Sequence, residues 1–256
     1  MIELHSKIYG KGKPLIIIHG LFGMSDNWNT LGKEFAKFFN VHIIDIRNHG
    51  KSPHSKVFDY NSMSSDLGNY INKHNLIKPI ILGHSLGGKI AMHFTALNQS
   101  NVEQLIVADI APKKYNTDFH HEILTVLYKL QLDSFKKREE VDHALSFYIK
   151  EKGTRLFLLK NLYRDDEKKF QWRLNIDVLL DKIINIQEAD FFSNNIEIPT
   201  LFIKGENSNY ITKEDKVSIN NFFTNVKFCE IENAGHWLHA DNPQLFYKQV
   251  IKFLKN

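Results

Sequence analysis

The chain has 256 residues, of which 43% are apolar and 24% are charged, and its formal net charge is +4. This is the composition of a globular protein large enough to bury a core. Its one cysteine, Cys229, can form neither an internal disulfide nor a thiolate zinc site, which excludes a disulfide-built secreted scaffold.

The first fourteen residues interrupt their few apolar side chains with charges and glycines, so they lack the apolar core of a signal peptide. The longest apolar runs, such as residues 15–18, are far shorter than the roughly 20 residues of a membrane helix. We therefore expect a cytoplasmic protein with no membrane span. Lysines lie beside acidic residues, as in 136–140 and 165–169, which predicts solvated helix faces and no nucleic-acid partner.

Short runs of β-branched and other apolar residues recur along the chain, and glycine-bearing turns follow several of them. Continuous apolar runs suit strands that are covered on both faces, which favours a parallel sheet with crossover helices. The predicted fold class is α/β. The strands are expected at 15–20, 41–46, 79–84, 105–110, 200–205 and 228–231.

Helical periodicity separates these strands. Apolar residues spaced three and four apart predict crossover helices at 28–38, 62–74 and 87–98, and a closing helix at 243–254. Between 112 and 196 the strand pattern stops, and we expect only helices there. Because this segment is rich in Leu, Ile, Phe and Tyr, it is predicted to be a folded helical insertion over one end of the sheet. Residues 1–111 and 197–256 then form the main domain.

The sequence GHSLG at 83–87 follows a predicted strand and begins a predicted helix. Glycines two before and two after a serine permit a sharp turn that a Cβ would obstruct. Such a turn places the hydroxyl of Ser85 above the carboxyl edge of the sheet, at the positive end of a helix dipole. Ser85 is therefore the candidate nucleophile, and the alternative is a glycine-rich turn with an incidental serine.

A serine nucleophile needs a base, and His236 is the best placed of the thirteen histidines. It follows the last predicted strand on a short loop, which brings it to the same edge as Ser85. The alternatives are a packed loop histidine or a metal pair with His239, but no carboxylate or cysteine accompanies that pair. No GxGxxG or GxxxxGK[ST] motif is present, so we expect neither a cofactor nor a metal.

The residue that orients the base is less obvious. An acid is expected after the strand at 200–205, but Asn207 and Ser208 stand there. Asp109 closes the strand at 105–110 and lies at the same sheet edge, so it is predicted as the acid, with Glu206 as the second choice. The alternative role of Asp109 is to cap its own strand. Ser208 is predicted as an auxiliary hydrogen-bond partner.

An oxyanion needs two N–H donors. The residue after the nucleophile, Leu86, supplies one, and the loop after the first long strand supplies the other, with Leu21 as first choice and Phe22 as reserve. His19 is expected to shape that loop through hydrogen bonds. The loop at 45–53 is expected to be pinned by local contacts of Asp45 and Arg47 rather than to bind substrate.

These segments together resemble the α/β-hydrolase superfamily, and more narrowly the bacterial YbfF-type esterases and their abhydrolase-domain relatives. The narrower signals are RNHG, DIAP after the sixth strand, and the Asn-Ser pair at 207–208. The resemblance runs from about residue 14 to the end of the chain. It is carried by HGLFG at 19–23, DIRNHGKS at 45–52, GHSLGGK at 83–89, DIAP at 109–112, WRLN at 172–175 and GHWLHADNP at 235–243.

The resemblance implies a mostly parallel sheet with a helical cap inserted after the sixth strand. It also implies a nucleophile Ser85, a base His236 and an acid Asp109, with Ser208 beside them. The implied activity is hydrolysis of carboxylic esters, for which we expect small to medium acyl chains, and acyl-CoA thioesters are the alternative substrate. A slow ligand-binding or sensor protein is the alternative from another class. Candidates for lining an acyl or CoA channel are Lys113, Lys114, Phe119, His120, Tyr163 and Trp172, but the favoured interpretation of each is that it packs against or solvates a helix. The oligomeric state is left open.

Overall fold

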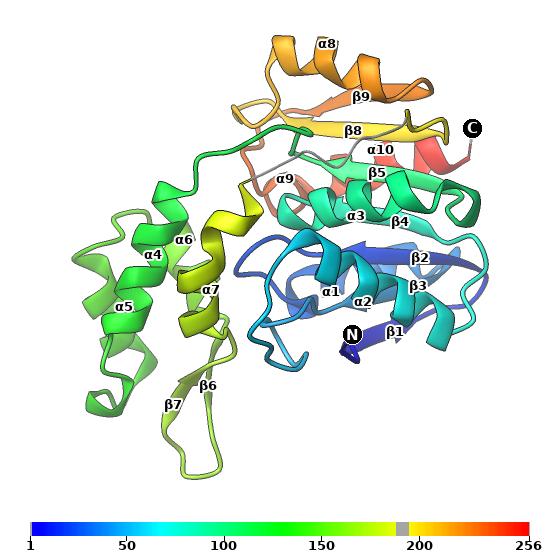
Figure 1. Ribbon diagram of the computed structural model, residues 1–256. Coiled ribbons are helices and arrows are strands. Elements are labelled where there is room, and N and C mark those ends of the chain that lie inside the picture. Colours follow the sequence, from blue (N-terminus) through cyan, green and yellow to red (C-terminus); the bar gives the residue numbers. More distant parts are fainter. Residues whose placement is uncertain (1, 188–194, 256) are drawn as a thin grey trace.

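The computed structural model describes residues 2–187 and 195–255. Their main feature is a seven-stranded sheet in the order β1-β3-β2-β4-β5-β8-β9 (Figure 1). All neighbours are parallel except β1, which pairs antiparallel with β3. The strands are β1 (Ser6–Tyr9), β2 (Lys13–Ile18), β3 (Phe39–Ile44), β4 (Ile80–His84), β5 (Gln104–Ala108), β8 (Thr200–Gly205) and β9 (Val226–Ile231).

Helices cover both faces of this sheet, as the continuous apolar strands require. In β2, Ile16 and Ile18 belong to the core on one face, whereas Leu15 and Ile17 belong to the core on the other. The first face is covered by α2 (Tyr60–Lys73), α3 (Leu86–Leu97) and α8 (Lys213–Phe222), and the second by α1 (Asn29–Phe35), α9 (Leu238–Asp241) and α10 (Pro243–Leu254).

The segment between β5 and β8 lies beside one end of the strands (Figure 1). This segment was expected after a sixth strand. It follows β5, which is only the fifth strand in chain order. Its helices pack through a continuous apolar core with the sheet. They are α4 (Asp118–Lys129), α5 (Arg138–Ser146), α6 (Lys152–Leu159) and α7 (Ile176–Lys182).

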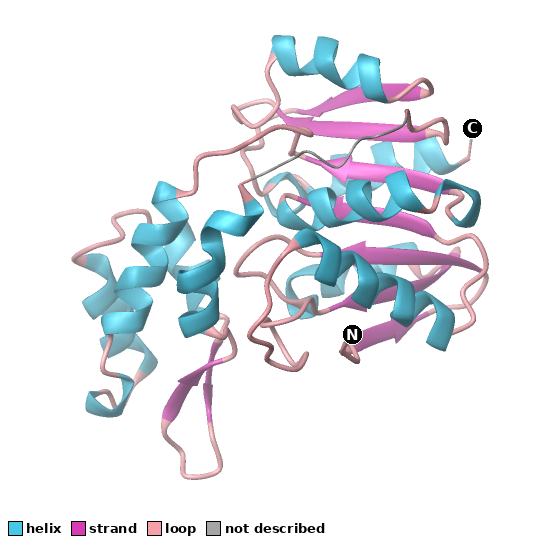
Figure 2. Cartoon of the chain, viewed as in Figure 1, coloured by secondary structure: helices cyan, strands magenta, loops and turns pink. Residues whose placement is uncertain are grey.

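This segment is not entirely helical, which corrects the prediction from periodicity. Figure 2 shows a hairpin between α6 and α7, formed by β6 (Leu162–Arg164) and β7 (Phe170–Trp172). The charged run 165–169, expected on a helix face, forms the turn of this hairpin. Lys168 adopts a positive φ of 63°, and its N–H donates to the carbonyl of Asp165 at 2.9 Å. Local turn bonds outweigh helical periodicity here.

Several other boundaries differ from those predicted. The helix expected at 28–38 is a 3-10 turn, η1 (Ser25–Trp28), followed by α1, which ends at Phe35. Neither β1 nor α8 was predicted, since their exposed faces weaken the apolar pattern. Further 3-10 turns are η2 (Gln99–Asn101), η3 (Leu132–Ser134) and η4 (Ile183–Ile186). Among the described residues, none of the helices has the length and apolar character needed to cross a membrane.

Candidate functional site

Ser85 lies at the sharp turn between β4 and α3. Its backbone has φ 52° and ψ −120°, a strained conformation for a residue with a side chain. A Cβ on Gly83 would overlap the carbonyl of Gly87, and a Cβ on Gly87 would overlap the carbonyl of Ile18 at the end of β2. Both glycines are therefore needed for the close crossing of strand and helix, as the motif predicts. Ser85 is the N-cap of α3, where unpaired N–H groups and the helix dipole favour negative charge.

Asp109 follows β5 and is completely buried, with a positive φ of 52°. Its Oδ1 accepts a hydrogen bond from the N–H of Gly205 at 3.1 Å, and its Oδ2 accepts one from the hydroxyl of Ser208. The Nδ1 atom of His236, in the loop between β9 and α9, lies 2.8 Å from the same Oδ2. These three donors make the carboxylate a buried anion with fixed partners.

The second-choice acid lies elsewhere. The carboxylate of Glu206 accepts the N–H of Asn233 at 2.7 Å and is exposed at the protein surface. The structure thus brings Asp109, and not Glu206, to the imidazole. The Asn-Ser pair at 207–208 contributes the hydroxyl that contacts Asp109.

Ser85 and His236 line one cavity of about 220 Å³. The loop of His236 is tied to the turn that carries Ser85 through His84, whose Nε2 lies 2.8 Å from the carbonyl oxygen of His236. Burial lowers the pKa of His84 well below its ordinary value, so this ring is neutral and donates its Nε2–H. Nothing in the sequence distinguishes His84 beyond its place in the GHSLG motif.

Tyr210 is a further residue that sequence reasoning missed. Its ring stacks on the imidazole of His236 with centroids 3.7 Å apart and planes 15° apart. The hydroxyl of Tyr115 donates to the carbonyl of Tyr210 at 2.5 Å and accepts the N–H of Ala111 at 2.9 Å. These two hydrogen bonds connect Tyr210 to the segment after Asp109, which restrains the position of the stacked ring. Its one signal in the sequence is an aromatic residue two positions after Ser208.

The candidate oxyanion loop at 19–23 is held by two neutral histidines. His19 Nδ1 lies 2.8 Å from the carbonyl of Gly20, and its Nε2 accepts the N–H of Ile46 at 3.1 Å, which is the expected shaping role. His49 Nδ1 lies 2.9 Å from the carbonyl of Arg47, and its Nε2 accepts the N–H of Phe22 at 3.2 Å. Burial lowers the pKa of His49 to about 3, so it remains neutral.

The hydrogen bonds of this loop distinguish the two candidates for the second oxyanion donor, the N–H groups of Phe22 and Leu21. The N–H of Phe22 is occupied by His49, whereas no hydrogen bond between described residues uses the N–H of Leu21. Leu86 is the first residue of α3, and the first N–H groups of a helix have no partner within it. Leu21 lines the cavity together with Ser85. Leu21 and Leu86 therefore stay the candidate pair, and the N–H of the reserve candidate, Phe22, already has a partner in His49.

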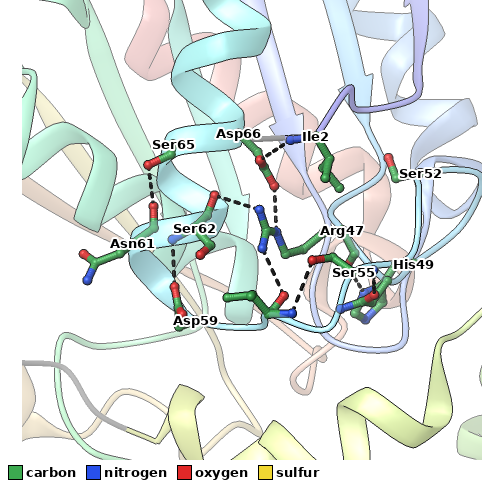
Figure 3. Close-up of polar contacts among 12 residues, drawn as sticks. Ile2, Arg47, His49, Ser52, Ser55, Asp59, Asn61, Ser62, Ser65 and Asp66 are labelled. Atoms are coloured by element: carbon green, nitrogen blue, oxygen red, sulfur yellow. Dashed lines mark hydrogen bonds and ion pairs between the residues drawn. The ribbon is translucent and has the colours of Figure 1, made fainter.

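The loop at 45–53 is pinned differently from the local network expected. Figure 3 shows Arg47 reaching Asp66 of α2, with Nε 2.7 Å from Oδ2, and both side chains are buried. The second oxygen of Asp66 accepts the N–H of Ile2 at 2.9 Å. Asp45 instead accepts the backbone N–H groups of Ser25 at 2.5 Å and Lys51 at 2.9 Å. Asp66, Ile2 and Ser25 are distant in sequence, because the fold brings those segments together, whereas Lys51 lies within the loop as expected.

Two of the suggested channel residues, Phe119 and His120 at the start of α4, line the cavity. Lys113 instead pairs with Asp215 of α8 at 2.6 Å. Tyr163 and Trp172 lie in the β6-β7 hairpin and do not line it. His239, considered as a metal partner of His236, is buried and stacks on Trp28 with centroids 4.1 Å apart, which explains its place without a metal.

Comparison with known proteins identifies the family of the chain. Residues 13–243 match the family model described as alpha/beta hydrolase fold. The chain is 37% identical to the sn-1-specific diacylglycerol lipase ABHD11 of Danio rerio, over 96% of this chain and 80% of the relative. It is 31% identical to the esterase YbfF of Escherichia coli, over 95% and 93% of the two chains.

A solved structure described as a marine microorganism esterase superimposes with a TM-score of 0.96 at 42% identity, covering 99% of this chain and 100% of the other. The sequence resemblance is thus confirmed at the level of the family and of the fold. The protein belongs to the α/β-hydrolase fold family, within the group of abhydrolase-domain esterases and lipases that these relatives represent.

Proposed function

We propose that this protein is a carboxylesterase that works through an acyl-enzyme on Ser85. The observation that carries the proposal is the 2.8 Å contact between His236 Nδ1 and Asp109 Oδ2. His236 and Ser85 line the same cavity. With Nδ1–H held by the carboxylate, the other ring nitrogen, Nε2, is an acceptor available to the serine hydroxyl. The esterase and lipase relatives support the same reaction class.

In the first step, His236 Nε2 takes the hydroxyl proton while Ser85 Oγ attacks the ester carbonyl carbon. The negative charge on the carbonyl oxygen is received by the N–H groups of Leu86 and Leu21, and each such donor contributes about 3 kcal/mol to lowering the barrier. The tetrahedral intermediate then collapses as His236 gives the proton to the leaving alkoxide. The products of this step are the free alcohol and the acyl-serine ester.

Deacylation repeats these reaction steps with water in place of the serine hydroxyl. His236 takes a proton from water, the hydroxide adds to the acyl carbon, and Ser85 leaves with the proton that His236 returns. Asp109 stabilises the imidazolium in both halves, and Ser208 holds the carboxylate as an auxiliary donor. In this scheme residues 112–196 act as a cap over a catalytic domain formed by 1–111 and 197–256, and Phe119 and His120 of this cap line the cavity.

The test compares the wild type with Ser85→Ala on a short chromogenic ester, with Ser134→Ala, at an exposed serine, as the matched control. We expect Ser85→Ala to lose nearly all turnover and the control to retain it. A fluorophosphonate probe, located by peptide mass spectrometry, should label Ser85. Equal activity of wild type and Ser85→Ala, or equal inactivity, would refute the proposal and favour a ligand-binding role.

A further inference from the structure

A chain of hydrogen-bonded amides connects the candidate oxyanion donor, the N–H of Leu21, to a buried asparagine between α6 and β6. The side-chain nitrogen of this residue, Asn161 Nδ2, donates to the carbonyl of Phe22 at 2.8 Å. That carbonyl shares a peptide group with the N–H of Gly23, which donates to the carbonyl of Gly20 at 3.0 Å. The carbonyl of Gly20 shares its own peptide group with the N–H of Leu21. The candidate donor is therefore the last group of this chain.

Two planar peptide groups transmit the position of the asparagine to the donor. A trans peptide group is rigid, and its carbonyl and N–H point in opposite directions. If the peptide between Phe22 and Gly23 turns, the carbonyl of Gly20 loses the Gly23 N–H and keeps only the contact with His19 Nδ1 at 2.8 Å. The peptide that carries the Leu21 N–H is then free to turn. Hydrogen-bonded amides also polarise one another, which makes the last N–H a stronger donor.

Phe22 depends on these bonds because its backbone is strained. It lies in the turn at 20–23 with a φ of 63°, a region that favours glycine. His49 Nε2 accepts its N–H at 3.2 Å, and Asn161 donates to its carbonyl. All three residues are buried, so water does not replace either bond. Loss of the donor at 161 would leave a buried carbonyl without a partner in a peptide that is already strained.

The backbone around the β6-β7 hairpin holds the asparagine in place. The N–H of Asn161 donates to the carbonyl of Leu158 at 2.9 Å, and its own carbonyl accepts the N–H of Arg173, just after β7, at 2.9 Å. Nδ2 also donates to the carbonyl of Leu158 at 3.2 Å, so both amide hydrogens are used. Oδ1 is buried and has no partner among the described residues, which costs free energy. The donor role explains why an amide stands at this position instead of an apolar side chain.

The segment after the hairpin supports Phe22 from its other side. Asn175 donates its backbone N–H to the carbonyl of Asn48 and its side-chain amide to Asn48 Oδ1, both at 3.0 Å. Asn48 has a positive φ of 65° and directly precedes His49, the acceptor of the Phe22 N–H. The two segments that flank the hairpin therefore restrain Phe22 at its carbonyl and, through His49, at its N–H. These contacts join the RNHG and WRLN sequences, which the proposed mechanism does not use.

We propose that Asn161 is a positioning residue that directs the N–H of Leu21 toward the oxyanion, through the backbone of Phe22 and Gly23. Ser85 and Leu21 line a second, smaller cavity of about 50 Å³ as well as the first, and Asn161 lines neither of them. It therefore acts through the loop and not on the substrate. This inference rests on the proposed function, because it takes the Leu21 N–H as an oxyanion donor. The oxyanion forms only in the transition state, so the effect belongs to kcat and not to KM.

The experiment replaces Asn161 by leucine, which has a similar shape and no donor. For Asn161→Leu we expect kcat with the chromogenic ester to fall about tenfold or more and KM to change by less than about twofold. A trifluoromethyl ketone gives a second readout. Ser85 Oγ adds to its carbonyl carbon, the hydroxyl proton passes to His236, and the ketone oxygen becomes an oxyanion at the Leu21 and Leu86 N–H groups. The inhibition constant should rise by the factor by which kcat/KM falls.

Phe170→Leu is the matched control. Phe170 is buried in β7 of the same hairpin, and its side chain has no hydrogen bond to give to the loop at 19–23. This variant should lower the free energy of unfolding, measured by denaturant titration, and leave kcat and the inhibition constant unchanged. If Asn161→Leu does not fold, Asn161→Ala removes the same donor with a smaller side chain.

The outcomes separate this inference from the proposed function. A folded Asn161→Leu that keeps the wild-type kcat, or that raises KM without weakening the trifluoromethyl ketone, overturns the positioning role while Ser85-dependent hydrolysis stands. The same holds if Phe170→Leu loses as much kcat as Asn161→Leu. A wild type that hydrolyses no chromogenic ester, and whose Ser85 is not labelled by a fluorophosphonate, overturns the proposed function and this inference together.

Discussion

Asp109 binds three donors that come from two separate parts of the chain. Gly205 ends β8, Ser208 follows it in the next loop, and His236 comes after β9. With two of these donors on the same oxygen, the carboxylate has a single orientation, and the imidazole bound to it takes that orientation too. A network of this kind is sensitive to the loss of any member, because the carboxylate has no access to water.

Replacing Ser208 by alanine should therefore lower kcat. The substitution removes one hydrogen bond to a buried anion, and such bonds contribute about 1.5 to 3 kcal/mol, so we expect a loss of about tenfold or more. KM should change little, because Ser208 lines neither cavity. Steady-state kinetics with the chromogenic ester measure both, with Ser134→Ala as control. An unchanged kcat would show that Ser208 does not support the carboxylate in catalysis.

Tyr210 should act on His236 through its ring rather than its hydroxyl. Aromatic stacking contributes about 0.5 to 1.5 kcal/mol, so Tyr210→Leu should lower kcat about two- to tenfold. Tyr210→Phe keeps the ring and should behave like the wild type. The comparison of kcat for these two variants is the test. If Tyr210→Phe loses as much activity as Tyr210→Leu, the hydroxyl is the group that supports catalysis and the stacking role is wrong.

At the scale of elements, the site depends on the close approach of strand ends and loops. β4, β5 and β8 end side by side, and each is followed by a residue of the candidate site. The same edge receives the His236 loop, whose backbone passes over Gly205. A Cβ at Gly205 would overlap the carbonyl oxygen of Gly235, next to His236, and would lie 2.7 Å from that of Ala234. The site therefore requires the absence of a side chain at Gly205 as well as the presence of its functional side chains.

Gly205→Ala should consequently destabilise the fold and displace His236. We expect the free energy of unfolding to fall by about 1 to 3 kcal/mol, the usual cost of overpacking, and kcat to fall with it. Gly153→Ala, at an exposed position in α6, is the matched control and should remain within about 1 kcal/mol of the wild type. Denaturant titration and ester kinetics give the two readouts. Wild-type stability and activity of Gly205→Ala would contradict the crowding described at this crossing.

Across the whole molecule, several buried histidines with lowered pKa values lie near the site. Burial lowers the pKa of His49 and His239 to about 3 and that of His120 to about 4. In the unfolded chain these rings have pKa values near 6.5. Below that pH the unfolded state binds protons at these histidines and the folded state does not. The free energy of unfolding therefore keeps its full value above about pH 6.5 and decreases as the pH falls toward 4.

The expected acid sensitivity is steep. Each such histidine weakens the fold by about 1.4 kcal/mol per pH unit once the pH lies well below 6.5. Melting temperatures between pH 7.5 and 4.5 should therefore fall, and His239→Gln should flatten the decline. His121→Gln, at an exposed histidine of the same protein, should leave the slope unchanged. A wild-type melting temperature that stays constant from pH 6.5 to 5 would contradict this account.

The sequence alone was sufficient for the fold family. Continuous apolar strands and helical spacing predicted the parallel sheet, because burial on both faces imposes a pattern that can be read locally. The turn at Ser85 was also readable, since its two glycines lie only two residues before and two residues after the serine. Predictions failed where local bonds override periodicity, as in the 165–169 turn, and where an element is half exposed, as in β1 and α8.

Only the tertiary structure decided which distant groups meet. The sequence left Asp109 and Glu206 as competing acids, and the folded chain brings Asp109 to His236 while Glu206 contacts Asn233. It likewise directed Arg47 to Asp66, stacked Tyr210 on His236 and bound the Phe22 N–H to His49. The physical reason is that these contacts join segments tens of residues apart. Spacing along the chain carries no information about such distances until the sheet is assembled.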